Sequence, residues 1–356
     1  MKKNIFIIII LIIAITGGLY FGLNYKKTEQ STNLQTMSVE EAIDKKQEEE
    51  SPQVKENKNK PWCITFQLVW NDLRDTLLGG KEINFIGGNP PLADKLNKKL
   101  YTKELLNEDS YYTKHGEISL DLKEEIEANI YKKFKETSDV LQYVDWKSDG
   151  YLFYAMLLKN FNFEVPFDLL PNKSFNDSQE QFKYFGTKED TKKSVLNNIA
   201  VLFYENDKNF AVQLRTKENE DVILYRTDKE DEYETIFEEL TKKSFMQEFR
   251  KTDFLSIPYI KVDELYSYDE LSGKQIDGTE YIISLALQTI KFNIDNKGGK
   301  LKSEAVIAVK NAMFRPEEIE ERYFHFDKPF YLFLKESEKD KPYYAMYVKD
   351  TKYLQK

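Results

Sequence analysis

Residues 291–309 read KFNIDNKGGKLKSEAVIAV and contain two stretches with the alternation of a β-strand. In the first stretch, Phe292 and Ile294 alternate with polar residues, which is the pattern of a strand with one buried face. After a break at Gly298 and Gly299 the alternation resumes, and because strand side chains repeat every two residues, this second stretch is compatible with entry into a sheet in one register. One of its faces carries Gly299, Leu301, Ser303, Ala305, Ile307 and Val309, and the other carries Lys300, Lys302 and Glu304.

The rest of the sequence places most predicted helices ahead of most predicted strands. Apolar residues at helical spacing predict helices over 64–78, 92–106, 120–142 and 231–243. Residues 151–167 are almost continuously apolar, which predicts a strand buried on both faces. Further strands are predicted over 199–205, 210–216, 221–227, 254–262, 285–294, 328–336 and 342–350, the first three as an antiparallel meander. This order indicates an α+β fold.

The N-terminal region has the pattern of a membrane anchor followed by a spacer. Residues 4–25 carry no charge, and a helix of that length spans about 33 Å, against a hydrocarbon core of about 30 Å. The apolar run is longer than that of a cleavable signal peptide and lacks a small-residue cleavage site. Residues 1–27 are therefore predicted to be an uncleaved signal anchor in a single-pass protein whose folded part lies outside the cytoplasm; secretion after cleavage is the alternative. Residues 28–60 are polar and predict a disordered linker, which leaves 61–356 as the folded domain.

Composition argues against several classes of protein. The net charge is −9, and a nucleic-acid-binding protein would need a basic patch. Cys63 is the single cysteine, so neither an intrachain disulfide nor a cysteine-based metal site can form, and its apolar neighbours predict a small core residue. The two histidines, His115 and His325, lie far apart in the sequence. We therefore predict no metal and no cofactor. Separately, the abundance of Lys, Asn, Ile and Glu suggests a bacterial source.

The sequence contains no enzyme signature that we recognise. The glycine pairs at 79–80, 87–88 and 298–299 fit neither of the common phosphate-binding patterns. His325 and Asp327 alternate along a predicted strand and have the residue types that orient a nucleophile, but no G-x-S-x-G motif accompanies them. A polar pair at a strand edge is the simpler interpretation. Acidic residues gather in runs such as DKEDEYE and RPEEIEER, which are typical of a solvated face.

Three segments of the second half share their order and content with one family. Residues 154–167, YAMLLKNFNFEVPF, keep Ala155, Lys159 and Phe167 of a buried strand in that family but lack its Asn, Gly and Trp. Residues 291–305 occupy the place of a strand followed by an alanine-rich hinge. Residues 323–350 follow the pattern of a C-terminal hairpin, and the closest match there is Lys328, Pro329 and Phe330 with Leu332 and Leu334. In these respects the chain resembles the serpins, a family of protease inhibitors.

The resemblance implies a fold of N-terminal helices followed by a large, mostly antiparallel sheet and a smaller C-terminal sheet. It also implies an exposed reactive loop at about 298–322, which a protease cleaves and which then enters the main sheet as an extra strand. The hinge of this loop would comprise Gly298, Gly299, Lys300, Leu301, Lys302, Ser303, Glu304 and Ala305. The scissile bond would lie among Lys310, Asn311, Ala312, Met313, Phe314 and Arg315.

The charges in the expected hinge leave two functions open. Lys300, Lys302 and Glu304 stand where the family has an alanine-rich run, and an unpaired charge is costly to bury. A shift of register by one residue would bury both lysines. The first function is that of a membrane-anchored extracellular inhibitor or bait for a protease. The second is that of a serpin-like module at the cell surface that binds a partner or has a structural role without inhibiting.

Overall fold

The computed structural model describes residues 60–302 and 321–356. Contacts within the chain divide it into two units, Met1–Asn57 and Lys58–Lys356, and the described residues all belong to the second unit. The signal anchor expected over 1–27, and the linker expected over 28–60 apart from Lys60, lie outside the described residues. Within the described residues, no helix has both the length and the apolar character that a membrane crossing requires.

Two of the four predicted helices match the structure and two are shorter than predicted. The helices over 64–78 and 231–243 are confirmed. The helix predicted over 92–106 ends at residue 97 and is followed by two short 3-10 turns. The five α-helices of the described part of the chain are α3 (Thr65–Leu78), α4 (Pro91–Asn97), α5 (Leu120–Phe134), α6 (Lys193–Leu196) and α7 (Tyr233–Lys243).

Helix α5 has a capping residue at each end. At the first end the Ser119 hydroxyl accepts a hydrogen bond from the backbone N–H of Leu122. At the other end Lys135 adopts a left-handed conformation with φ of 58°, which terminates the helix. The prediction that this helix runs to residue 142 was therefore wrong, and the segment after Lys135 is free to take another path.

The largest sheet has seven antiparallel strands in the order β1-β17-β16-β9-β8-β7-β10. The predicted meander and C-terminal hairpin both belong to it and are confirmed. One face of the sheet packs on the main hydrophobic core, and the other lies under α7, where the ring of Phe237 meets Phe333 edge-on. The strands are β1 (Trp62–Cys63), β7 (Ile199–Asn206), β8 (Asn209–Arg215), β9 (Glu220–Arg226), β10 (Gln247–Glu248), β16 (Phe330–Glu336) and β17 (Tyr344–Val348).

A second sheet has four strands in the order β15-β11-β6-β5. Strand β15 runs parallel to β11, whereas the other neighbours are antiparallel. The strand predicted over 254–262 is divided at Tyr259, and its first half belongs here while its second half belongs to another sheet. The members are β5 (Asp168–Lys173), β6 (Phe182–Gly186), β11 (Phe254–Pro258) and β15 (Tyr323–His325).

A third sheet, in the order β12-β13-β14-β4, lies beside the two-stranded pair β2-β3. The strand predicted over 151–167 is divided at Leu158, whose N–H donates to the carbonyl oxygen of Ser110. Strand β2 was not predicted, because its sequence YYTKHGE interrupts the apolar alternation with Lys114, His115 and Gly116. The members are β2 (Tyr111–Glu117), β3 (Tyr151–Leu157), β4 (Lys159–Asn162), β12 (Ile260–Ser267), β13 (Leu287–Ile294) and β14 (Gly298–Leu301).

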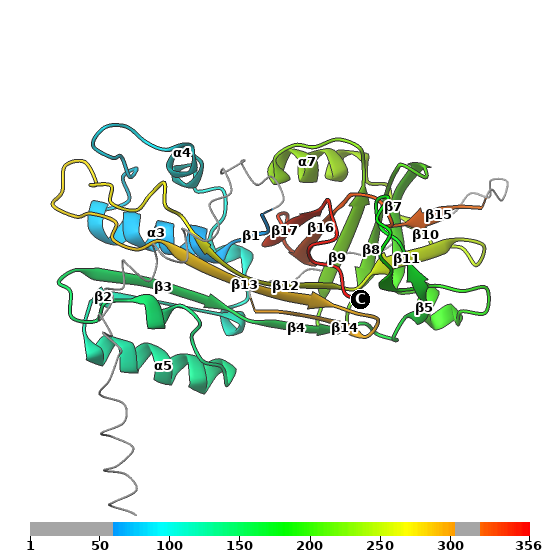
Figure 1. Cartoon of the computed structure of the whole chain (residues 1–356), viewed down its shortest axis with the longest axis horizontal. Coiled ribbons are helices and arrows are strands. Elements are labelled where there is room, and N and C mark those ends of the chain that lie inside the picture. Colours follow the sequence, from blue (N-terminus) through cyan, green and yellow to red (C-terminus); the bar gives the residue numbers. More distant parts are fainter. Residues whose placement is uncertain (1–59, 303–320) are drawn as a thin grey trace, which may run out of the picture. The chain divides into compact units, whose positions relative to one another are not determined.

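Helices cover both faces of this third region (Figure 1). On one face, Ile126 and Ile130 of α5 pack in a cluster with Tyr154 and Met156 of β3. On the other face, α3 contacts β3, and its residue Leu68 joins the main core. The strands β3, β4, β13 and β14 therefore form the middle layer between α5 and α3.

Candidate functional site: a partly filled slot between two strands

Strand β14 lies between β13 and β4, in the middle of the third sheet. Leu301 is paired with Phe292 on one side and with Lys159 on the other, and all three strands are antiparallel to their neighbours. The Leu301 side chain is fully buried in the main core, whereas the Lys300 side chain is about half exposed on the outward face. The start of the segment that was expected to form the hinge is therefore a strand of the sheet, with its lysines turned away from the core.

The glycine pair is required because β14 passes very close to its neighbours. A Cβ atom on Gly298 would lie 2.2 Å from the carbonyl oxygen of Phe161, and φ at this position is +151°. A Cβ atom on Gly299 would lie 2.7 Å from the carbonyl oxygen of Asn293. Real Cβ atoms do not approach other atoms so closely, and therefore only glycine fits here. The sequence pattern suggested a flexible pair, whereas the structure gives both glycines a steric role.

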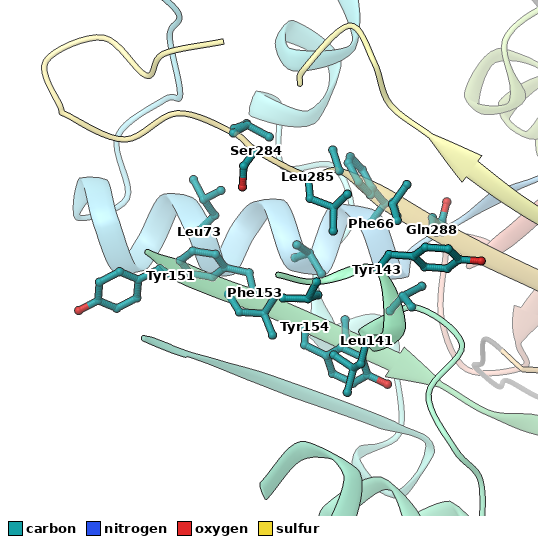
Figure 2. A pocket seen from close by; sticks show the side chains of 18 of the residues that line it. Phe66, Leu73, Leu141, Tyr143, Tyr151, Phe153, Tyr154, Ser284, Leu285 and Gln288 are labelled. Carbon is teal, nitrogen blue, oxygen red and sulfur yellow. The ribbon is translucent and has the colours of Figure 1, made fainter. Parts of the chain in front are cut away.

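Beyond Leu301 the two neighbouring strands separate, and the gap between them is a cavity. In the described residues, β3 has β2 as its only ladder partner, and residues 287–290 of β13 pair only with β12. The cavity between them has a volume of about 670 Å³. Figure 2 shows Phe66 and Leu73 of α3, Phe153 of β3 and Leu285 around it. Lys302, which follows β14, also lines the cavity, so the cavity continues the line of that strand. We call this cavity the slot.

Five charged residues gather where β14 reaches the slot. The Lys300 ammonium lies 2.8 Å from Glu136, and the Lys302 ammonium lies 3.1 Å from Asp139. Asp139 also pairs with Lys291 of β13 at 2.8 Å. The hydrogen bond from Lys300 lowers the pKa of Glu136; burial would raise the pKa of Asp139, but hydrogen bonds from Lys291 and Lys302 lower it on balance. Both carboxylates belong to the segment that follows α5.

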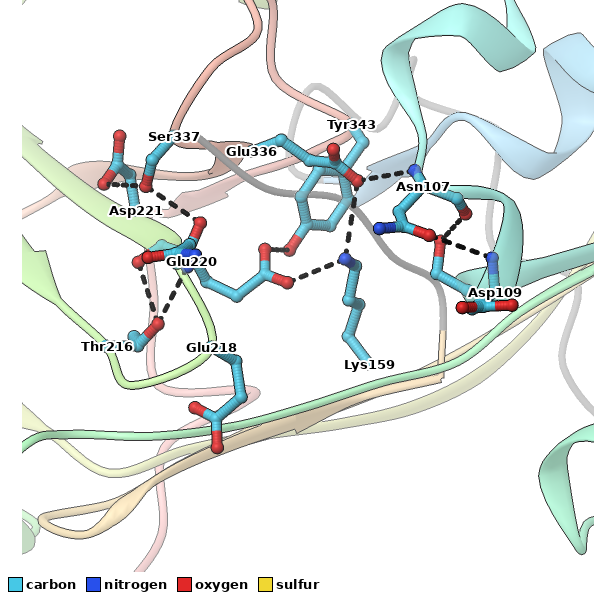
Figure 3. A network of polar contacts seen from close by, with 12 residues as sticks. Asn107, Asp109, Lys159, Thr216, Glu218, Glu220, Asp221, Glu336, Ser337 and Tyr343 are labelled. Atoms are coloured by element: carbon cyan, nitrogen blue, oxygen red, sulfur yellow. Dashed lines mark hydrogen bonds and ion pairs between the residues drawn. The ribbon is translucent and has the colours of Figure 1, made fainter. Parts of the chain in front are cut away.

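A second charged cluster lies on the core side of β4 (Figure 3). The Lys159 ammonium is 2.7 Å from Glu220 and 3.5 Å from Glu336, and these two glutamates are directly opposite each other on β9 and β16. The Tyr343 hydroxyl donates a hydrogen bond to Glu220, and the N–H of Asn107 donates one to Glu336. All three charged side chains are at most 6% exposed.

This buried cluster has one cation for two acids, and its charge balance favours a bound proton. Burial raises the pKa of Glu220 to about 8 despite the opposing effect of Lys159, and burial also raises the pKa of Glu336. The cluster therefore holds a proton to a higher pH than a solvent-exposed glutamate would. Lys159 was noted in the sequence only as part of a resemblance, and its two acidic partners, which lie far along the chain, were missed.

The remaining sequence candidates have different outcomes. Ser303, Glu304 and Ala305, together with the expected scissile region 310–315, lie outside the described residues. Cys63 is buried in the main core as predicted, and burial raises the pKa of its thiol to about 12, far from a reactive thiolate. His325 is partly buried on β15, and no hydrogen bond joins it to Asp327 in the part of the chain that the structure describes.

Arg322, near the C-terminal end of the segment 303–320, is fixed by several hydrogen bonds. The Arg322 guanidinium donates two hydrogen bonds to the buried carboxylate of Asp253, at 3.1 and 2.7 Å. It donates further hydrogen bonds to the Gln247 side chain and to the carbonyl oxygen of Glu248. A bidentate arginine–carboxylate pair with these extra acceptors fixes both the position and the direction of the chain. Residues 303–320 therefore connect two anchored points, Lys302 and Arg322.

No protein-family model and no curated protein matches the chain. Solved structures do, and one is Serpin48, a highly specific serpin of the insect Tenebrio molitor, with 12% identity and a TM-score of 0.41 over 80% of this chain and 96% of that one. Thyroxine-binding globulin in complex with thyroxine is similar over 64% of each chain, with 14% identity and a TM-score of 0.40. Mouse protein-Z dependent protease inhibitor is similar over 80% of this chain and 79% of that one, with 11% identity and a TM-score of 0.41.

All three of these structures are serpins, the family that the sequence resembles. At these identities and TM-scores none of them bears on the function of this chain, which must be inferred from its own residues.

The close approach of β14 to β4 can be tested with the substitution Gly298→Ala. We expect a loss of about 1–3 kcal/mol in the free energy of unfolding, because the added Cβ would clash with the Phe161 carbonyl oxygen. Gly278→Ala is the matched control, since Gly278 also has a positive φ, of 72°, but has open space around a Cβ. Urea denaturation measures both variants. An equal loss in the two would show that backbone strain alone, and not the packing of β14, sets the effect.

The buried proton can be tested by the pH dependence of stability. Glu220 has a raised pKa in the folded chain, so the folded state binds its proton more tightly than the unfolded state does. The contribution of Glu220 to stability should therefore be fully present below the unfolded pKa of about 4.5 and be lost as pH rises toward 8, by at most about 1.4 kcal/mol per pH unit. We expect Glu220→Gln to remove this fall.

Denaturant midpoints between pH 5 and 8 measure the effect. Glu338→Gln is the control, because Glu338 follows β16 in the same hairpin but is exposed. We expect this variant to keep the wild-type pH dependence. If Glu220→Gln also keeps it, then Glu220 does not carry the proton.

Proposed function

We propose that this chain is a membrane-anchored extracellular protein of serpin-like fold that presents the segment between Lys302 and Arg322 as bait for a protease. Cleavage of that segment frees its first part to extend β14 into the slot. The residues 4–25 supply the anchor, and the protease is the partner. No cofactor takes part, and the chain itself carries out no chemistry.

The observation that carries this proposal is the pair of strand edges that face the slot. The backbone groups of β3 and of residues 287–290 on the slot side have no ladder partner within 60–302 and 321–356. A buried backbone N–H or C=O without a partner is costly, and therefore such edges favour the addition of a strand. The four residues of β14 already form the beginning of such a strand, between β13 and β4.

The sequence after β14 suits the slot. Continuing the observed register places Ser303 between Leu157 and Ile290, and Ala305 between Ala155 and Gln288. These two small residues would face the side where α3 begins, and Ile307 would follow them on the same face. On the opposite face, which Met156 shares, Glu304 is the one further charge before Lys310. The stretch 303–309 is thus uncharged on the face that an inserted strand would turn toward α3.

The anchored ends explain how cleavage would start the insertion. While the segment is intact, its far end is held at Arg322 by Asp253, and the first part cannot travel the length of the slot without pulling against that anchor. A cut between the two anchors removes the restraint. Insertion then gains backbone hydrogen bonds on two edges and buries apolar side chains against the apolar residues that line the slot, such as Phe66 and Phe153.

A second candidate function is a serpin-like module that binds a partner without inhibiting a protease. The charges Lys300, Lys302 and Glu304 favour it, because they stand where the family pattern is alanine-rich. In this alternative the segment after β14 stays out of the slot, whether it is cut or intact.

Limited proteolysis of the folded chain tests the proposed insertion. We expect a single cut within 303–320 to raise the melting temperature by tens of degrees, because the new strand joins two unpaired edges and fills the slot. Mass spectrometry locates the cut, and calorimetry of the nicked and intact chains measures the shift. An unchanged melting temperature would rule out insertion and leave the binding module as the function.

A pair of neighbouring substitutions tests the register of the inserted strand. We expect Ala305→Lys to abolish the rise in melting temperature on cleavage, because its ammonium would be buried beside Gln288 and α3. Glu304→Lys places a lysine one residue earlier, on the opposite face and at a position that already carries a charge, and should keep most of the rise. Equal effects of the two variants would contradict the register.

A further inference from the structure

The five charged residues at the entrance to the slot form one connected cluster, which we call the latch: Glu136, Asp139, Lys291, Lys300 and Lys302. The two acids come from the segment after α5, and the three lysines come from β13 and from β14 with the residue that follows it. The Lys302 ammonium also donates a hydrogen bond to the carbonyl oxygen of Thr137, at 2.9 Å. The latch therefore joins the segment after α5, which covers the sheet, to the end of β14.

The three lysines would repel one another without the acids. Lys302 is adjacent to Lys291 across the two strands, because its N–H donates to the Lys291 carbonyl oxygen. Lys300 and Lys302 point to the same outward face of β14. Like charges on neighbouring strands are destabilising, and the Lys302 side chain is only 12% exposed, so its charge is also partly desolvated. A strand with this sequence needs carboxylates above it to remain in the sheet.

The two acids meet that need in different ways. Asp139 bridges Lys291 and Lys302, so one carboxylate ties β13 to the end of β14. Glu136 pairs with Lys300 at 2.8 Å and reaches Lys302 at 3.8 Å. Both acids depend on α5 ending at Lys135, because a longer helix would carry residues 136–139 along a different path.

We propose that the latch holds β14 in the sheet, and that this hold weakens as the ionic strength rises. This inference concerns the regulation of the proposed insertion and rests on that function for its biological meaning. The hold on β14 itself is a property of the described residues, and it can be measured whether or not insertion occurs. Lys300 and Lys302 would oppose insertion if their charges were unpaired. Because they are paired with Glu136 and Asp139, they instead hold β14 at the position from which insertion would start.

Digestion with a lysine-specific protease tests the latch on the folded chain. The rate of cleavage after Lys302 reports how often β14 leaves the sheet, since cleavage of a transiently opened segment follows the open population. We expect this rate to rise about tenfold between 0.05 and 1 M NaCl, because salt screens ion pairs that are not fully buried. In the double variant Glu136→Gln/Asp139→Asn the rate should be high at both salt concentrations. A wild-type rate and salt dependence in that variant would overturn the proposal.

Internal references separate release of β14 from general unfolding. Lys297 lies in an exposed turn before β14 and should be cut at a similar rate in every variant, whereas Lys159 is buried and reports unfolding of the whole domain. Glu125→Gln is the matched control, because it removes the ion pair between Lys114 and α5 on the surface without touching β14. We expect this control to leave cleavage after Lys302 unchanged.

A charge swap provides a rescue that a merely destabilised fold would not show. Glu136→Lys should release β14, and the double variant Glu136→Lys/Lys300→Glu should restore protection of the Lys302 bond by re-forming the pair with its charges exchanged. Failure of the rescue would contradict the latch. If cleavage within 303–320 leaves the melting temperature unchanged while these protection results hold, then insertion is wrong and the latch is right.

Discussion

Backbone hydrogen-bonding groups need partners, and this requirement governs the region between β3 and β13. Each of the two strands has a partner on its far side, β2 for β3 and β12 for β13. On the near side β14 supplies partners as far as Leu301, and the N–H of Lys302 adds one hydrogen bond to Lys291. Beyond that point the slot separates the two edges. In the described residues these two edges have no neighbouring strand on the slot side to satisfy their backbone groups. The interior of this region therefore has a strand position that β14 occupies only in part.

The buried cluster around Lys159 connects this incomplete sheet to the largest one. Lys159 belongs to β4, and its acidic partners belong to β9 and β16. Removal of the lysine would leave two glutamates facing each other in the core, which is far more costly than the loss of an exposed pair. Because Lys159 is also the strand neighbour of Leu301, the end of β14 stands directly beside the joint between the two sheets.

Much of the fold could be predicted from the sequence because it depends on local patterns. The meander from β7 to β9, the hairpin of β16 and β17 and the helices α3 and α7 follow from apolar periodicity and turn residues. The C-terminal end of α5 could not be predicted, since a lysine in a left-handed conformation has no strong sequence signal. The steric role of Gly298 and the partners of Lys302 depend on residues more than a hundred positions away, and no local pattern contains them. For the candidate site, the alternation beyond Gly298 was visible in the sequence, whereas the slot and the latch required the structure.

The two anchored ends of the segment between Lys302 and Arg322 belong to different sheets. Strand β14 is part of the third sheet, and β15 is part of the second. A peptide bond broken between them would leave its two new ends attached to separate scaffolds, and once one end had moved into the slot, no thermal motion would bring the pair back together. Under the proposed insertion, such a molecule would act once and then remain as a lasting record of a single cut.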